Sequence, residues 1–177
     1  MAVTATLAGN VRTRIAANYS GTLDLVTDAI DVGLTEPNFF DWTITTGTTA
    51  NKADLMWWDT RTIASGADDD TIDLAGVLTD VFGNVLTFAR VKGIVVSSAT
   101  ANDVDIQVGG GAAAALDTLF GATADYILVK PGGAFAVFAP DATAYVPTAT
   151  TADILRLSAA GGGSTATVSI VLIGASA

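Results

Sequence analysis

The chain is 177 residues long, and 50% of these residues are hydrophobic while only 15% are charged and 7% aromatic. This length suffices for one well-buried domain, and so few charges on a folded chain suggest that partners cover part of its surface. The net charge of −10 disfavours binding to nucleic acid or to an anionic membrane, and no apolar run approaches the ~18 residues of a membrane span.

The first fifty residues are expected to form an N-terminal arm of short strands. Apolar and polar residues alternate weakly at its start, and its end is aromatic and β-prone. Glu36 precedes Pro37 and is therefore pushed toward an extended conformation. The elements predicted in this arm are strands at 2–17, 22–26 and 38–45, with a turn-rich segment at 28–37.

A loop at 45–52 leads to a strand predicted at 53–64, which contains two adjacent tryptophans. Trp57 and Trp58 must face opposite sides of this strand, because successive side chains of a strand alternate. One of the two is therefore expected at a contact with a partner, where tryptophan is enriched. An acidic connection follows at 65–70.

The chain is organised around the stretch 71–98, which predicts a strand, a compact turn and the longest β-prone run in the sequence. The turn contains Asp80, Gly83 and Asn84, which are residue types that tolerate tight backbone angles. From position 85 to 98 nearly every residue is β-branched, aromatic or small, which is typical of a strand packed on both faces.

The C-terminal half adds further short strands and one segment, 109–121, in which a short helical turn is allowed. Pro131 and Gly132 fit the two central positions of a type II turn, so 126–138 is predicted to be a hairpin. In the last strand, Val168, Ile170 and Leu172 are expected to face the core. The strands predicted in this half are 103–108, the two arms of 126–138, 153–158 and 165–173.

About ten short strands at regular spacing, with no alternation of strands and helices, indicate a sandwich or barrel. The predicted fold is all-β, a jelly-roll-like antiparallel β-sandwich with little or no helix. The predicted organisation is an N-terminal arm at 1–50 and a sandwich domain at 51–177, together forming one compact unit.

Catalytic and metal-binding chemistry finds little support in the residue types present. The chain has no cysteine and no histidine, which excludes disulfides, thiol catalysis, Cys/His zinc sites and imidazole bases. The acidic cluster Asp68, Asp69, Asp70 and Asp73 lacks the spacing of a calcium loop and is interpreted as a solvated connection. The carboxylate pairs weighed for glycoside hydrolysis, Asp54 with Asp59 and Asp103 with Asp105, lack an orienting partner. We therefore expect no enzyme activity, no cofactor and no metal.

Eight residues are candidate partner contacts, because large aromatics gather in the first third of the chain and cations are scarce in it. Aromatic residues most often fill a core, and arginines can pair with carboxylates of their own chain, so both alternatives stay open. The candidates are Arg12, Arg14, Phe39, Phe40, Trp42, Trp57, Trp58 and Arg61.

Six segments give the chain a resemblance to a family of small structural proteins of tailed-bacteriophage virions and prophages. They are WDTRTIA (58–64), DLAGVLTDVFG (73–83), TFARVKGI (87–94), QVGG (107–110), KPGGAF (130–135) and APDATAY (139–145). The resemblance implies a head decoration (cement) protein on the outer capsid surface of the virion. It implies a homotrimer that binds the major capsid protein and has no active site. The alternative is a tail or fibre module that binds a receptor or glycan.

Overall fold

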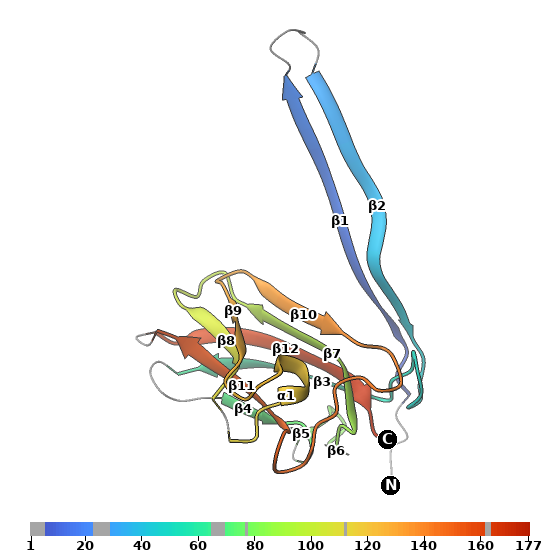
Figure 1. Cartoon of the computed structure of the whole chain (residues 1–177), viewed down its shortest axis with the longest axis vertical. Helices are drawn as coiled ribbons and strands as arrows, with labels where there is room; N and C mark the ends of the chain where they lie inside the picture. The colour runs from blue at the N-terminus through green and yellow to red at the C-terminus, as the bar shows by residue number, and fades with distance from the viewer. Residues whose placement is uncertain (1–5, 23–28, 65–69, 77, 112, 162–163) are drawn as a thin grey trace. The chain divides into compact units, whose positions relative to one another are not determined.

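The structure is a computed structural model that describes residues 6–22, 29–64, 70–76, 78–111, 113–161 and 164–177, with the backbone alone at 13–22 and 29–39. Strands dominate the described residues, and the helix described among them, α1 (Asp117–Phe120), has four residues. The prediction of an all-β chain with little or no helix is therefore confirmed. The chain divides into two compact units, Ala8–Ile44 and Met1–Leu7 with Thr45–Ala177. We call the first unit the ribbon and the second the body (Figure 1).

The ribbon consists of β1 (Gly9–Thr22) and β2 (Ala29–Ile44), which pair in antiparallel fashion. The predicted strand at 38–45 coincides with the end of β2 as far as Ile44. The turn-rich assignment of 28–37 is wrong, since 29–37 is also part of β2. The register shifts where Glu36 and Pro37 lie, and a bulge is a place where a strand tolerates proline. The predicted strand at 22–26 lies, after Thr22, outside the described residues.

The body is a sandwich of two four-stranded antiparallel sheets. One sheet has the order β10-β7-β12-β3 and the other β4-β11-β8-β9, and a small two-stranded sheet pairs β5 with β6. The strands are β3 (Leu55–Ile63), β4 (Asp70–Asp73), β5 (Leu78–Thr79), β6 (Val85–Leu86), β7 (Arg90–Ser98), β8 (Asp105–Gly109), β9 (Tyr126–Val129), β10 (Ala134–Phe138), β11 (Ile154–Ala160) and β12 (Ala166–Ala175).

The hydrophobic core lies between the two sheets. Ile94 and Leu172 enter it from one sheet, Ile106 and Leu155 from the other, and all four side chains are fully buried. The predicted inward face of the last strand is confirmed, because Val168, Ile170 and Leu172 are buried while Thr167 and Ser169 are exposed. The inward residues of such an alternating strand form one half of the core when a second sheet packs on that face.

The predicted hairpin at 126–138 is wrong in its pairing, although its turn is correct. The amide of Gly133 donates to the carbonyl oxygen of Lys130 at 2.8 Å, and Gly132 has a φ of +73°. However, β9 pairs with β8 and β10 pairs with β7, so this turn carries the chain from one sheet to the other. A turn motif fixes a change of direction, but it does not decide which strands pair.

The predicted run at 85–98 is divided into β6 and β7, and β7 contains a bulge. Ile173 lies opposite Gly93 and Gly174 lies opposite Val91, so Lys92 is the extra residue. Most of β7 is buried, as expected for a strand packed on both faces. The bulge lets Val91 and Ile94 both reach the core, although they are three positions apart.

Candidate interaction surface

β3 carries the two adjacent tryptophans along one edge of its sheet. Trp57 is buried in the core, whereas Trp58 is 52% exposed, so the prediction that they face opposite sides is confirmed. A half-exposed tryptophan on an edge strand has a large apolar surface that remains in contact with water.

The turn between β5 and β6 is held together by one carboxylate. Asp80 accepts hydrogen bonds from the amides of Phe82 and Asn84, both at 2.8 Å, and from the Asn84 side-chain nitrogen at 3.0 Å. Gly83 has a φ of +82°, which a residue with a side chain rarely adopts. The turn predicted from Asp80, Gly83 and Asn84 is confirmed.

This hydrogen-bonded turn presents apolar side chains to solvent. Val81, Phe82 and Val85 are 64%, 61% and 65% exposed. Together with Trp58 they form what we call the apolar patch, beside a hollow of about 400 Å³ whose lining also includes Leu55, Met56, Asp54 and Asp80. Sequence analysis did not single out Val81 and Phe82, although two large apolar residues at the tip of a polar turn are themselves a signal of a contact surface.

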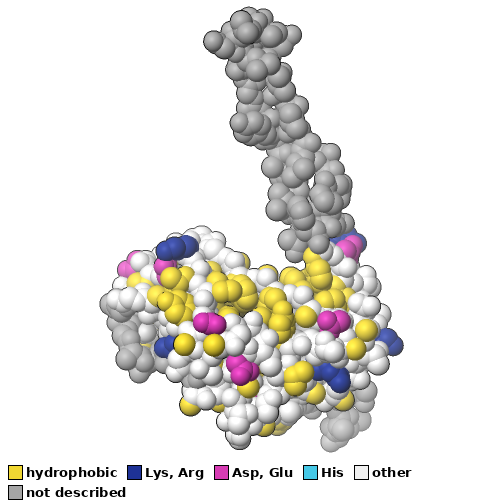
Figure 2. Space-filling model, in the orientation of Figure 1, with side chains coloured by type: hydrophobic (Ala, Val, Ile, Leu, Met, Phe, Trp, Pro, Cys, Tyr) yellow, Lys and Arg dark blue, Asp and Glu magenta, His cyan; other side chains and the backbone are white. Residues whose placement is uncertain are grey.

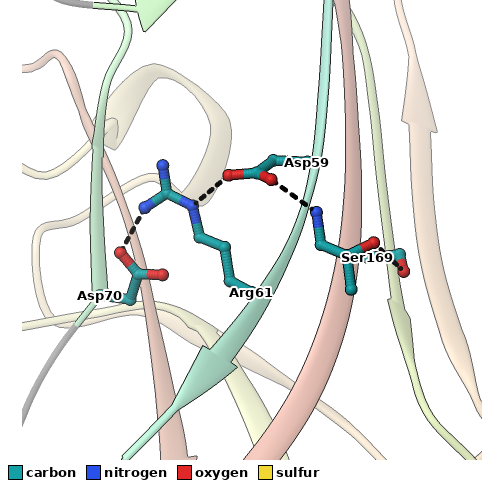
Figure 3. Close-up of polar contacts among 5 residues, drawn as sticks. Asp59, Arg61, Asp70 and Ser169 are labelled. Carbon is teal, nitrogen blue, oxygen red and sulfur yellow. Dashed lines mark hydrogen bonds and ion pairs between the residues drawn. The ribbon is translucent and has the colours of Figure 1, made fainter.

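Arg61 is engaged within its own chain (Figure 3). Its Nε donates to Asp59 at 3.1 Å, its Nη1 pairs with Asp70, and its guanidinium lies 5.4 Å from the centre of the Trp57 ring. The side chains of Thr60 and Ser169 hydrogen-bond at 3.0 Å across the same sheet. Arg61 therefore ties the β3 edge strand to β4 of the opposite sheet.

The remaining candidate contacts lie in the ribbon. Arg12 is exposed and pairs with Asp41 at 3.1 Å on the neighbouring strand. Phe40 is half-buried and Trp42 is buried. The candidates Arg14 and Phe39 lie in β1 and β2, and their side chains fall outside the described set.

Lys92 is a buried cation in the bulge of β7. Its ammonium group donates to the carbonyl oxygens of Thr49 at 2.6 Å, Lys52 at 2.7 Å and Thr48 at 3.4 Å, and its side chain is 0% exposed. Burial, helped by the nearby positive charge of Arg90, lowers the pKa of Lys92. The bulge in β7 places this ammonium group where it holds the loop at 45–52 in shape.

The carboxylates weighed for catalysis have partners within the chain. Asp54 accepts hydrogen bonds from the amide and hydroxyl of Ser176 at 2.9 and 2.6 Å, and Asp59 pairs with Arg61. Asp103 accepts from Ser164 at 2.8 Å and Asp105 from Lys130 at 2.6 Å. Of the acidic cluster, Asp68 and Asp69 lie outside the described residues. Within the described ranges, no group of three or more acidic side chains is placed to hold a metal ion.

The visible face of the body carries several hydrophobic areas, with acidic and basic side chains scattered among them (Figure 2). Among the described residues, no helix has the length and apolar character needed to cross a membrane. Exposed hydrophobic areas of this kind are surfaces suited to contact with a partner.

Acidification is expected to loosen the turn that presents the apolar patch. Its hydrogen bonds, led by the one from the Asn84 side chain, lower the pKa of Asp80 below its usual 3.8. The stabilisation is therefore complete above pH 3.8 and is lost as the pH falls through the lowered pKa. Urea unfolding between pH 5 and 2 should show a smaller acid loss for Asp80→Asn than for the wild type. Equal acid losses would contradict this role.

No protein-family model matches the chain, and neither the curated proteins nor the solved structures contain a match.

Proposed function

We propose that the chain is a non-enzymatic structural protein of a tailed-bacteriophage virion. In this role it decorates the head, where it binds the outer capsid surface and bridges neighbouring copies of the major capsid protein. Bridging adds buried apolar area to contacts that the pressure of packaged DNA would otherwise separate, and a stable contact of this kind needs about 1,600 Å².

The strand order of the body is the observation that carries this proposal. Lettered B to I in chain order, β3, β4 and β7 to β12 give B-I-D-G in one sheet and C-H-E-F in the other. This order supports a jelly roll, an architecture common among viral capsid proteins. The phage-like sequence segments, the small number of charges and the apolar patch also support the proposal.

Self-association into a homotrimer belongs to the same proposal. A chain with net charge −10 binds a copy of itself most readily through uncharged surfaces, and the apolar patch is one such surface. A three-fold assembly would also match the three-fold sites of an icosahedral shell.

A second candidate function is a receptor- or glycan-binding tail module. The observation in its favour is the hollow beside Trp58 and Phe82, since exposed aromatic side chains around a shallow depression suit a sugar ring, and jelly rolls also occur among lectins.

Copy number separates the two functions. Quantitative mass spectrometry of purified particles is expected to find on the order of hundreds of copies per virion, as repeated shell sites require. A handful of copies per particle would instead favour the tail module.

A further inference from the structure

The edge strand β9 exposes hydrophobic side chains on both of its faces. It is the last strand in the order β4-β11-β8-β9, and no other strand among the described residues pairs with its free edge. Ile127 lies on the same face as the buried Val129, whereas Tyr126 and Leu128 lie on the outer face of the sheet. Tyr126, Ile127 and Leu128 are all exposed. A hydrophobic edge strand offers its backbone N–H and C=O groups as a template for another strand.

The charges that flank β9 make it complementary to a second copy of itself. Asp125 precedes the strand and Lys130 follows it, both exposed, and the four residues between them carry no charge. An antiparallel pair of β9 strands brings the acidic end of each beside the basic end of the other, whereas a parallel pair would bring like charges together. The ammonium group of Lys130 already binds Asp105 at 2.6 Å, but its side chain is 75% exposed and has further N–H donors for a second carboxylate.

Symmetry restricts the register of such a pair. When a two-fold axis relates two antiparallel strands, one residue lies opposite its own copy, because opposing side chains must share a face of the sheet. The exposed hydrophobic run of β9 is centred on Ile127. With Ile127 opposite its own copy, Tyr126 lies opposite Leu128 of the second chain, and Leu128 opposite Tyr126. This register brings all three exposed hydrophobic side chains of each copy into the contact.

We propose that two copies of the chain pair through β9 in antiparallel fashion, centred on Ile127, so that two four-stranded sheets join into one. The contact is two-fold and uses no residue of the apolar patch, so it goes beyond the three-fold assembly of the proposed function. A pair of four-residue strands is much smaller than the about 800 Å² per partner of a standard interface, so it binds weakly between free chains. It becomes effective where copies are held side by side at a high local concentration.

Cysteine pairing tests this register, because the sequence contains no other cysteine. Ile127→Cys is expected to form a disulfide-linked dimer under mild oxidation, since opposing Cα atoms of an antiparallel pair lie about 4.5–5.5 Å apart. Val146→Cys is the matched control for random collision, because Val146 is 43% exposed and Ile127 is 40% exposed. Leu128→Cys is the control for register, because in this pair it lies two positions from its own copy. Each control should give at least about tenfold less dimer. Equal yields from Ile127→Cys and Val146→Cys, or more dimer from Leu128→Cys than from Ile127→Cys, would overturn the proposal.

A second measurement does not depend on disulfide geometry. Ile127→Lys and Ile127→Asp each place like charges opposite one another, and each should weaken two-fold association at least about tenfold in sedimentation at up to about 1 mM protein. An equimolar mixture of the two variants places a cation opposite a carboxylate and should recover the association. Circular dichroism checks that both variants fold, as expected for a residue that is 40% exposed. A wild-type chain without two-fold association at this concentration, single variants that associate like the wild type, or a mixture that associates no better than either variant would contradict the inference.

Discussion

Gly174→Ala is expected to destabilise the body by about 3 kcal/mol or more, because the new methyl group has no room. A Cβ atom at this position would lie 2.2 Å from the carbonyl oxygen of Arg90 and 2.6 Å from the Phe88 ring. The oxygen belongs to β7, which pairs with β12 at this point, and the ring is fully buried. Neither neighbour can move without breaking sheet pairing or the core.

Gly76→Ala is the matched control for this prediction. Its added methyl group would meet nothing closer than 3.5 Å, and its φ lies outside the left-handed region. This variant should keep the wild-type free energy of unfolding or exceed it by about 0.5 kcal/mol, because alanine restricts the unfolded chain more than glycine does. Urea denaturation followed by tryptophan fluorescence gives both values. A loss of less than about 1 kcal/mol for Gly174→Ala would show that the strands separate easily at this position.

Lys92→Ala is expected to lower the free energy of unfolding by about 2–3 kcal/mol. It removes a charged donor from three backbone carbonyl oxygens and leaves the loop at 45–52 without its buried tie. Lys52→Met, which removes an exposed ammonium group from the same loop, is the control and should cost less than about 0.5 kcal/mol. Similar losses in the two variants would mean that the buried ammonium group does not stabilise this loop.

The pH dependence of stability distinguishes the charge of Lys92 from its packing. Its pKa in the folded chain lies below the ordinary 10.5, so between the two values the unfolded chain binds more protons. The free energy of unfolding should therefore rise as the pH increases through this window toward 10.5. Lys92→Met should lose this rise. The same alkaline rise in wild type and variant would assign it to another group.

The sequence predicted the fold class well because its apolar residues alternate in short runs. Val168, Ile170 and Leu172 are buried and their polar neighbours are exposed, as a pleated strand requires. Pairing was harder to predict, because it depends on contacts far apart in the chain. The Pro131-Gly132 turn was recognised, yet the strands on either side of it join different sheets.

The turn prediction for the segment around Glu36 and Pro37 was wrong for a related reason. Proline and acidic residues favour turns locally, but β1 pairs with the same residues and a bulge accommodates the proline. Pairing with β1 along most of its length outweighed the local preference of these residues for a turn, as tertiary context often does for strands.

The candidate surface was predicted only in part. Trp57 and Trp58 were placed on opposite faces from alternation alone, and the exposed one lies in the apolar patch. Val81 and Phe82 were not singled out, because their exposure depends on how Asp80 holds the turn. Lys92 could not be recognised as buried from the sequence. Its environment is created by the bulge in β7 and by a loop 40 to 44 residues earlier in the chain.

The most direct test of the decoration role is to image purified phage heads after incubation with the gold-labelled protein. We expect label spread regularly over the outer shell. Phe82→Asp should bind less, because a weaker assembly engages fewer sites at once. Label confined to tails or fibres, or heads that stay bare at saturating protein, would contradict the decoration role.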